Sequence, residues 1–263
     1  MFNEGKFIIL QTEQPYFSLF FELKSKILKY DLENCPNIDD LKQTINDLKK
    51  EHNLVLITSN ELSKQLNCIC DFEVKVKQPT NNFSLKKPRQ ITLIASCMRA
   101  SKSKIIIDRF YDNEKEVDAF KPMVDTRDGD FIKSRAYSDE KTIPCLRVNN
   151  PEEMLKSTKP IIIIDEFQFF DADLLKDTVL NLKEQGKSII IAGLDLLASG
   201  EEWPAYRAIK EISDVEIKPK ARCQICEKPA SFTSLVKGQK NKSVQVESEQ
   251  TVYEPRCKEH FTH

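Results

Sequence analysis

The sequence is poor in glycine, lacks a long apolar segment and carries almost no net charge. Six glycines occur among its 263 residues, well below the usual share of about 7%, and none lies between Gly5 and Gly129. The longest apolar runs, Phe7–Leu10 and Ile161–Ile164, are much shorter than the ~20 residues that span a bilayer. With 40 basic and 41 acidic residues the formal charge is −1, so we expect neither membrane nor direct nucleic-acid binding.

A basic signal-peptide start is also missing, because Glu4 is acidic. We expect an intracellular protein in a reducing compartment, most simply the cytoplasm, with an organelle left open. Eight cysteines do not require disulfides in a chain of this length. Five of them are scattered and are interpreted as buried small hydrophobic residues: Cys35, Cys68, Cys70, Cys97 and Cys145.

Hydrophobic periodicity predicts an α/β fold. Strand-like Ile91–Ala95, Ile161–Asp165 and Ser188–Gly193 alternate with helical patterns that start at Lys102 and cover Asp171–Gln185. Wholly apolar strands in this order are typical of a parallel sheet with helices on both faces.

The domain organisation follows from a break in this pattern. Residues 77–90 contain two prolines and paired asparagines, as connectors do. The predicted parts are an N-terminal α/β extension (1–76), a linker (77–90), an α/β domain (91–220) and a C-terminal subdomain (221–263). The extension has expected strands at Lys6–Leu10 and Leu54–Thr58, and expected helices at Ser18–Leu32 and Ile38–Lys50. Its Asn46–Thr58 resembles Asn181–Ala192, which leaves a degenerate repeat and an unrelated extension equally open.

Near the C-terminus, a C-x2-C pair is followed by a C-x2-H pair. These residues are Cys223, Cys226, Cys257 and His260. Two chelating pairs of sulfur and nitrogen ligands are what tetrahedral Zn²⁺ requires, and four protein ligands leave no open position, so the zinc is expected to be structural. A zinc ribbon can also bind nucleic acid, with Lys237, Lys240 and Lys242 between the pairs, but the near-neutral charge makes this a minor alternative.

Two further patterns indicate phosphate chemistry. The apolar run Ile161–Ile164 ends in Asp165 and Glu166, where a strand delivers carboxylates to the ligand-binding edge of a parallel sheet. The stretch Ser96–Ser103 (SCMRASKS) has the frame of the phosphate-binding P-loop, G-x-x-x-x-G-K-[ST], with Ser96 and Ser101 in place of both glycines. Lys102 and Ser103 occupy the positions that reach phosphates and Mg²⁺.

The order of these blocks resembles the type II thymidine kinases, which are zinc-containing P-loop deoxynucleoside kinases. The resemblance covers the chain from about Pro88 onwards. It rests on the P-loop frame and five more blocks: Phe120–Arg127 (FKPMVDTR), Ile161–Phe170 (IIIIDEFQFF), Ala192–Asp195 (AGLD), Cys223–Cys226 (CQIC) and Tyr253–His260 (YEPRCKEH).

The resemblance implies a P-loop-type parallel sheet and a role for each matching residue. Glu166 corresponds to the general base that takes the proton of the nucleoside 5′-hydroxyl. Binding of ATP and Mg²⁺ is implied for Ser96, Met98, Ser101, Lys102, Ser103, Asp125, Arg127, Asp165 and Gln168. Binding of thymidine or a related deoxynucleoside is implied for Met98, Phe169, Leu194, Thr233 and Tyr253. A zinc-anchored lasso loop, Leu235–Val252, is expected to cover the nucleoside.

Three hypotheses therefore stand side by side. The first is an ATP-dependent thymidine kinase. The second is a catalytically impaired homologue that acts as a zinc-stabilised subunit of a larger assembly through its N-terminal domain; the serines of the P-loop, and Phe167 where the family usually has glycine, favour it. The third is the zinc-ribbon nucleic-acid binder. Family members form homo-oligomers, so a homo-oligomer and a subunit of a larger complex are both expected states.

Overall fold

The computed structural model divides the chain into two compact units, Met1–Lys87 and Pro88–His263. The structure describes residues 90–134, 141–237 and 251–261, and, of the chain before residue 90, the backbone of four strands. The division falls within the 77–90 range that was expected to be a linker, of which only Gln90 is described. The boundaries of the four assigned domains stay a prediction.

In the first unit the four strands form a parallel sheet in the order β2-β1-β3-β4. They are β1 (Phe7–Gln11), β2 (Leu28–Asp31), β3 (Asn53–Ile57) and β4 (Phe72–Val76). The predicted strands Lys6–Leu10 and Leu54–Thr58 are confirmed within one residue. The predicted helix Ser18–Leu32 is wrong at its end, because β2 occupies that part. Its sequence, LKYD, alternates apolar and polar residues with the period of a strand.

The remaining predictions for the first unit fall on residues outside the described ones. These are the rest of the Ser18–Leu32 helix and the Ile38–Lys50 helix.

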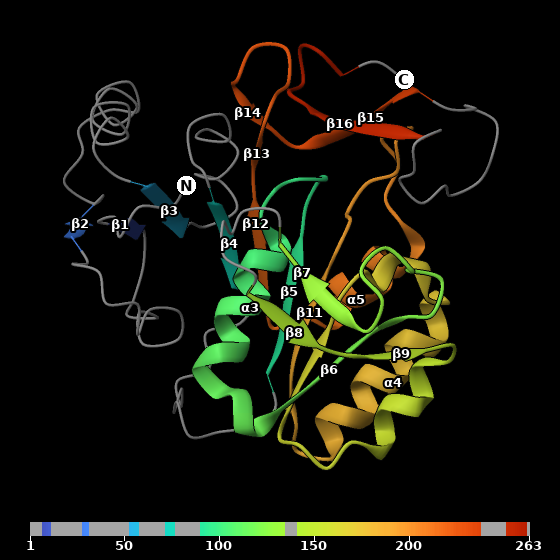
Figure 1. Cartoon of the computed structure of the whole chain (residues 1–263). Coiled ribbons are helices and arrows are strands. Elements are labelled where there is room, and N and C mark those ends of the chain that lie inside the picture. Colours follow the sequence, from blue (N-terminus) through green and yellow to red (C-terminus); the bar gives the residue numbers. More distant parts are fainter. Residues whose placement is uncertain are drawn as a thin grey trace. The chain divides into compact units, whose positions relative to one another are not determined.

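The second unit is built on six parallel strands in the order β12-β5-β11-β10-β6-β9. In chain order, the elements from β5 to β12 are β5 (Ile91–Ala95), α3 (Lys102–Asn113), η3 (Glu114–Glu116), β6 (Val117–Pro122), β7 (Phe131–Lys133), β8 (Thr142–Pro144), β9 (Leu146–Val148), η4 (Pro151–Lys156), β10 (Ile161–Ile164), η5 (Phe167–Phe169), α4 (Ala172–Glu184), β11 (Ser188–Gly193), α5 (Pro204–Ile212) and β12 (Val215–Pro219). Four shorter strands follow: β13 (Ala221–Arg222), β14 (Pro229–Ala230), β15 (Phe232–Lys237) and β16 (Val252–Arg256). They pair as two antiparallel ribbons, β13–β14 and β15–β16, at one end of the unit (Figure 1).

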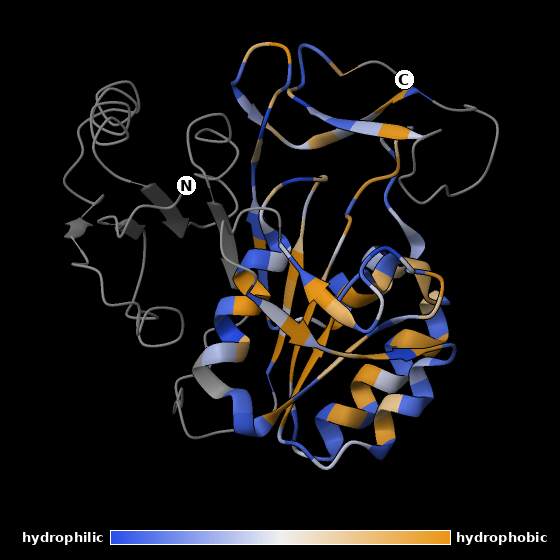
Figure 2. Ribbon diagram, in the orientation of Figure 1, coloured by the Kyte–Doolittle hydropathy of each residue, from blue (hydrophilic) through white to orange (hydrophobic). Residues whose placement is uncertain are grey.

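The core of the second unit lies on both faces of this sheet. Alternate strand residues such as Leu93 and Ile162 are fully buried in one cluster with Leu175 of α4 and Ile209 of α5. Of the intervening strand residues, on the face opposite α4 and α5, Ile94 and Ile163 are buried whereas Thr92 and Ile190 are half-buried, and α3 buries its own apolar residues outside that cluster. Figure 2 shows the hydrophobic strands at the centre and the two-sided character of α4. The predicted α/β fold with a parallel sheet and helices on both faces is confirmed.

Local signals set the ends of the helices. The side chain of Asp171 accepts a hydrogen bond from the amide of Leu174 and caps α4. Pro204 occupies the first turn of α5, where a missing amide hydrogen does no harm. Among the described residues, no helix is long and apolar enough to cross a membrane.

Candidate active site and metal centre

Several polar side chains meet at the edge of the sheet where parallel strands end. Ser96 follows β5, Asp165 follows β10 and Leu194 follows β11, and these strands are neighbours or next neighbours. The carboxyl edge of a parallel sheet is where ligands bind in α/β proteins. The strand order therefore brings three of the sequence blocks to one place.

The backbone is strained at the same place. Among the described residues four that are not glycine have positive φ, namely Arg99 (59°), Ser101 (62°), Glu166 (53°) and Glu227 (58°). Each costs of order 1–3 kcal/mol, and such residues cluster at functional sites. Arg99 and Ser101 lie in the loop after β5, Glu166 follows β10, and Glu227 follows the zinc-ligand candidate Cys226. All four thus belong to the two sites that the sequence indicated.

The loop Ser96–Ser101 is tied at both ends and along its length. The amide of Ser96 donates to the carbonyl of Gly193, and the amide of Met98 donates to Thr233 Oγ1 at 3.0 Å. Lys102 turns back over the loop and donates to the carbonyl oxygens of Ser96 (3.2 Å) and Cys97 (2.7 Å). Ser103 lies in the first turn of α3, where amide groups have no partner within the helix.

An ion-pair chain connects the DTR segment to the carboxylate after β10. Asp125 is buried and accepts from Arg127 Nε at 2.8 Å. The guanidinium of Arg127 also donates from Nη2 to Glu166 Oε1 at 2.5 Å. The other oxygen of Glu166 accepts from Gln168 Nε2 at 2.5 Å. Glu166 is therefore held by two donors, one on each oxygen, and its side chain is 20% exposed.

Asp165 is buried beside this chain. Removal from water and, next, the negative charge of Glu166 raise the pKa of Asp165 to about 7, although the positive charge of Lys102 acts in the opposite direction. A carboxylate that burial disfavours so strongly is stabilised in its charged form by a cation. Asp165 and the Ser103 hydroxyl are the oxygen ligands here that fit Mg²⁺.

Phe169 and Leu194 follow β10 and β11, respectively, at the same edge of the sheet as Glu166. Phe169 and Leu194 are partly buried against the core cluster, and the amide of Leu194 donates to Gln168 Oε1 at 3.0 Å. Phe169 packs edge to face on Trp203, with ring centroids 6.0 Å apart. The backbone amide of Leu194 thus bonds Gln168, the residue that holds Glu166, and Phe169 directly follows Gln168 in the chain.

The other expected nucleoside-binding residues lie on the C-terminal strands and the loop. Thr233 is buried in β15 and bonds Met98, whereas Tyr253 lies in β16, where it pairs with Leu235. Most of the expected lasso loop, residues 238–250, lies outside the described residues, and so do Lys240 and Lys242.

One departure from the family pattern, Phe167, fits in the core against a glycine of a matching block. A Cβ on Gly193 would clash with Gln168 Oε1 and would lie 2.6 Å from the ring of Phe167. Gly193 is therefore required for close packing. Phe167 is fully buried there, so the side chain that replaces a glycine turns into the core.

Sequence reasoning missed several residues at this site. Trp203 is the single tryptophan of the chain, which was a usable signal for an aromatic contact. Lys121 is 1% exposed, lies 3.6 Å from Asp125 Oδ2 and donates to the carbonyl of Phe131. Lys218 lies 2.9 Å from Asp195 Oδ2. Nothing in a single sequence distinguishes these two lysines from the 40 basic residues of the chain.

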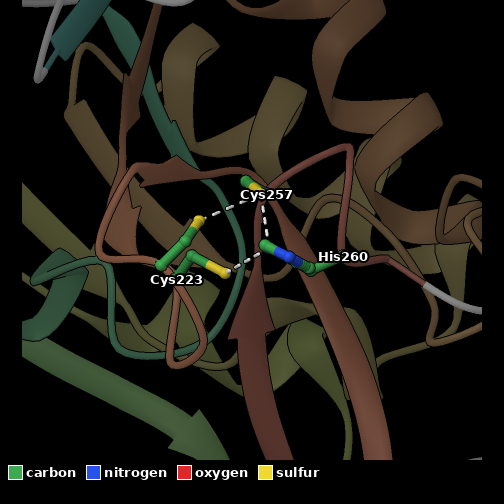
Figure 3. Close-up of side chains that lie close together, drawn as sticks. Cys223, Cys257 and His260 are labelled. Carbon is green, nitrogen blue, oxygen red and sulfur yellow. Dashed lines mark hydrogen bonds between the residues drawn. The ribbon is translucent and has the colours of Figure 1, made fainter.

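The four candidate metal ligands come together, as predicted. The ligand atoms of Cys223, Cys226, Cys257 and His260 all lie within 4.8 Å of one another, and Figure 3 shows three of these side chains turned toward a common point. Cys226 Sγ lies 3.6 Å from Cys257 Sγ, and His260 Nδ1 lies 3.3 Å from Cys257 Sγ and 3.7 Å from Cys223 Sγ.

This donor set fits Zn²⁺. With zinc–sulfur bonds of about 2.3 Å, the edges of a tetrahedron measure about 3.8 Å, close to the distances between these ligand atoms. Burial alone would raise the pKa of Cys223, but amide donors from Cys257, Ile225 and Cys226 outweigh it and lower the pKa to about 6. The thiolate that a metal needs is thus favoured before the metal binds.

The metal centre and the loop after β5 share one small core. Cys97 and Ala100 of the loop are buried with Ala221, Cys223, Ala230 and Cys257. The thiol of Cys97 donates to the carbonyl of Ala230 at 3.4 Å, and burial raises its pKa to about 11. The thiol of Cys97 is thus neutral and packs in this core. The C-terminal ribbons therefore pack against the loop.

Comparison with known proteins assigns the family. The family model described as thymidine kinase matches residues 89–261, and the chain therefore belongs to the thymidine kinase family. Among individual relatives, a thymidine kinase of Mycoplasma genitalium is 33% identical over 148 residues, which cover 54% of this chain and 68% of that protein. The region that the family model matches corresponds to the second unit, Pro88–His263.

Proposed function

We propose that the protein is an ATP-dependent thymidine kinase that transfers the γ-phosphoryl group to the 5′-hydroxyl of thymidine or a close deoxynucleoside. The observation that carries the proposal is the network Asp125–Arg127–Glu166–Gln168 at the carboxyl edge of the sheet. It holds a carboxylate at the edge of the sheet where β5 leads into the loop Ser96–Ser101, and the partly exposed Phe169 lies three residues further along the chain.

Glu166 acts as the general base. Each carboxylate oxygen can accept two hydrogen bonds, so the bonds from Arg127 and Gln168 still leave a lone pair for the substrate hydroxyl. The proton of the 5′-hydroxyl moves to Glu166 as its oxygen forms a bond to the γ-phosphorus. The bond between the γ-phosphorus and the β,γ-bridging oxygen breaks, and its electron pair leaves with ADP.

The phosphates of ATP belong at the loop Ser96–Ser101 and the first turn of α3. Ser101 already has the left-handed conformation that glycine would adopt easily, which supports phosphate binding despite the substitution. Lys102 exchanges its bonds to the carbonyls of the loop for bonds to phosphate oxygens. Asp165 and Ser103 would hold Mg²⁺, which would supply charge neutralisation for the transferring group.

The nucleoside base belongs against Phe169 and Leu194, with Met98, Thr233 and Tyr253 as further contacts. Zinc at the four-ligand centre is structural and holds β13–β16, which include Thr233 and Tyr253. The zinc thus acts on catalysis through the position of these strands.

The test is formation of thymidine monophosphate from thymidine and ATP by the full-length, zinc-loaded protein. A Glu166→Gln variant keeps the shape of the side chain but removes the base, and we expect it to lower turnover by about 10²- to 10⁴-fold. Equal turnover by wild type and variant would contradict the role of Glu166.

A second candidate function has an observation of its own. The bonds of Lys102 to the carbonyls of Ser96 and Cys97 satisfy the lysine within the loop, as expected for a catalytically impaired homologue kept as a zinc-stabilised subunit of a larger assembly. Folded, zinc-loaded protein that neither turns over thymidine nor binds ATP in calorimetry would support this candidate. Partners of the N-terminal unit, and a homo-oligomer, remain predictions for either function.

A further inference from the structure

Lys218 neutralises two buried carboxylates, those of Asp195 and Glu216. Lys218 Nζ lies 2.9 Å from Asp195 Oδ2 and 3.9 Å from Glu216 Oε1, and the two acidic side chains are 6% and 3% exposed. Glu216 also accepts a hydrogen bond of 2.6 Å from the hydroxyl of Tyr206. Lys218 lies 5.0 Å from the centroid of the Tyr206 ring, so its ammonium is surrounded by two negative charges and an aromatic face.

Asp195 is the point where this cluster meets the nucleoside pocket. Its side chain accepts from the amide of Leu196 at 3.0 Å, and its carbonyl accepts from the amide of Trp203 at 3.0 Å. The indole of Trp203 returns a bond to the carbonyl of Leu196. These three bonds close the segment between Asp195 and Trp203 into a fixed turn.

Both ends of this turn contact the pocket. The residue before it, Leu194, donates to Gln168, which in turn holds Glu166. The residue at its end, Trp203, packs on Phe169. A displacement of the turn would therefore move both Leu194 and Phe169, the two residues proposed to contact the nucleoside base.

We propose that Lys218 is a positioning residue for the nucleoside pocket, which it fixes through its ion pair with Asp195. This inference rests on the proposed function, since it concerns the same pocket. The physical reason is that a buried carboxylate without its partner is strongly unfavourable. Without Lys218, Asp195 would turn toward water and carry Leu194 and Trp203 with it. Lys218 itself does not contact the substrate.

A buried lysine at the opposite edge of the sheet provides a control. Lys187 is 6% exposed and donates to the carbonyls of Ser157 and Lys159 at 2.7 and 2.8 Å. It precedes β11 at the amino end of that strand, opposite the carboxyl edge where the pocket lies. Lys187→Met also removes a buried cation, but away from the pocket.

The experiment measures thymidine binding to the full-length, zinc-loaded protein by equilibrium dialysis and by the fluorescence of Trp203. Because Trp203 is the only tryptophan and packs on Phe169, its emission reports the pocket directly. We expect Lys218→Met to raise the Kd for thymidine about tenfold, with a smaller change in kcat at saturating thymidine, because misplaced contacts weaken binding. Lys187→Met should bind thymidine as wild type does.

A triple variant keeps the test decisive if Lys218→Met does not fold. Lys218→Met with Asp195→Asn and Glu216→Gln removes the cation and both carboxylates that it neutralises, so it should recover stability but still bind thymidine weakly, because the ion pair no longer holds the turn. A Kd within twofold of wild type in either folded variant would overturn the positioning role. Absence of thymidine binding by wild type would overturn both this inference and the proposed function, whereas binding without turnover would overturn only the catalytic part of the latter.

Discussion

Ser101 begins α3 with φ of 62°, in the left-handed region that favours glycine. A residue with a Cβ loses roughly 1–2 kcal/mol in this conformation. The loop nevertheless keeps it, since the amide of Met98 and the thiol of Cys97 are both bonded to the C-terminal strands. Tertiary contacts therefore hold a conformation that the residue itself disfavours.

A glycine at this position should relieve the strain. We expect Ser101→Gly to raise the free energy of unfolding by roughly 0.5 kcal/mol, the relief being partly offset by the greater freedom of glycine in the unfolded chain. Urea unfolding measures the difference. Ser103→Gly, two residues further in the regular helix, should lower stability by about 0.5 kcal/mol. Equal losses in both variants would show that Ser101 is not strained.

The carboxyl of Asp165 links stability to pH. Burial and the charge of Glu166 raise its pKa from the ordinary value of 3.8 to about 7. Protonation therefore favours the folded state, and this stabilisation is complete below the unfolded pKa and is lost as the pH rises through about 7.

The matching variant is Asp165→Asn, which cannot ionise. Its free energy of unfolding, relative to wild type, should be higher at pH 8 than at pH 4 when both proteins are measured without divalent cations. Asp177→Asn, an exposed change in α4, should show no such trend. A constant difference between Asp165→Asn and wild type across this range would mean that the carboxyl stays ionised in the fold.

At the scale of elements, the C-terminal ribbons and the loop after β5 behave as one structure. Cys97 and Ala100 share their buried cluster with Cys223 and Cys257. A zinc ion that organises the ribbons therefore also organises the loop, although the two are more than a hundred residues apart in the chain.

Chelation of zinc should therefore loosen the loop. We expect removal of the metal to increase amide hydrogen exchange in residues 96–101 as well as in β13–β16, while exchange in β10 and α4 changes little, because their core cluster is separate. Cys257→Ser should reproduce the effect and bind less than one zinc per chain. Cys145→Ser, a buried cysteine outside the cluster, should keep full zinc. Unchanged exchange in residues 96–101 would separate the loop from the metal centre.

The strands also show how much of the secondary structure hydrophobic periodicity can predict. Ile91–Ala95 and Ser188–Gly193 were predicted to the residue, because wholly apolar strands between polar segments leave little choice. The sequence predicts Leu28–Asp31 to be the end of a helix, because four residues are too few to reveal the alternation of a strand within a longer segment of helical spacing. Its pairing with β1 is a tertiary fact that local sequence does not contain.

At the scale of the whole molecule, the order of the motifs along the chain indicated the family more clearly than any single motif did. The zinc ligands could be found by spacing alone, because chelating pairs are local. The Arg127–Glu166 and Lys218–Asp195 pairs could not, since each joins residues that lie in, or follow, different strands. The positive φ of Glu166 was equally hidden, because glutamate gives no sign of it.

The first unit stands apart in this respect. The family match begins at residue 89, so it does not include the parallel strands β1–β4. A role in docking a partner therefore stays a prediction for this unit.

The metal centre also has a consequence for chain length. With a metal bound, Cys226 and Cys257 are joined at one point, so the segment between them is a closed loop whose ends do not depend on its length. Doubling such a loop costs only about 0.6 kcal/mol of closure entropy. Insertions and deletions between β15 and β16 should therefore be tolerated among natural variants of this protein, whereas the spacing within each ligand pair should stay fixed.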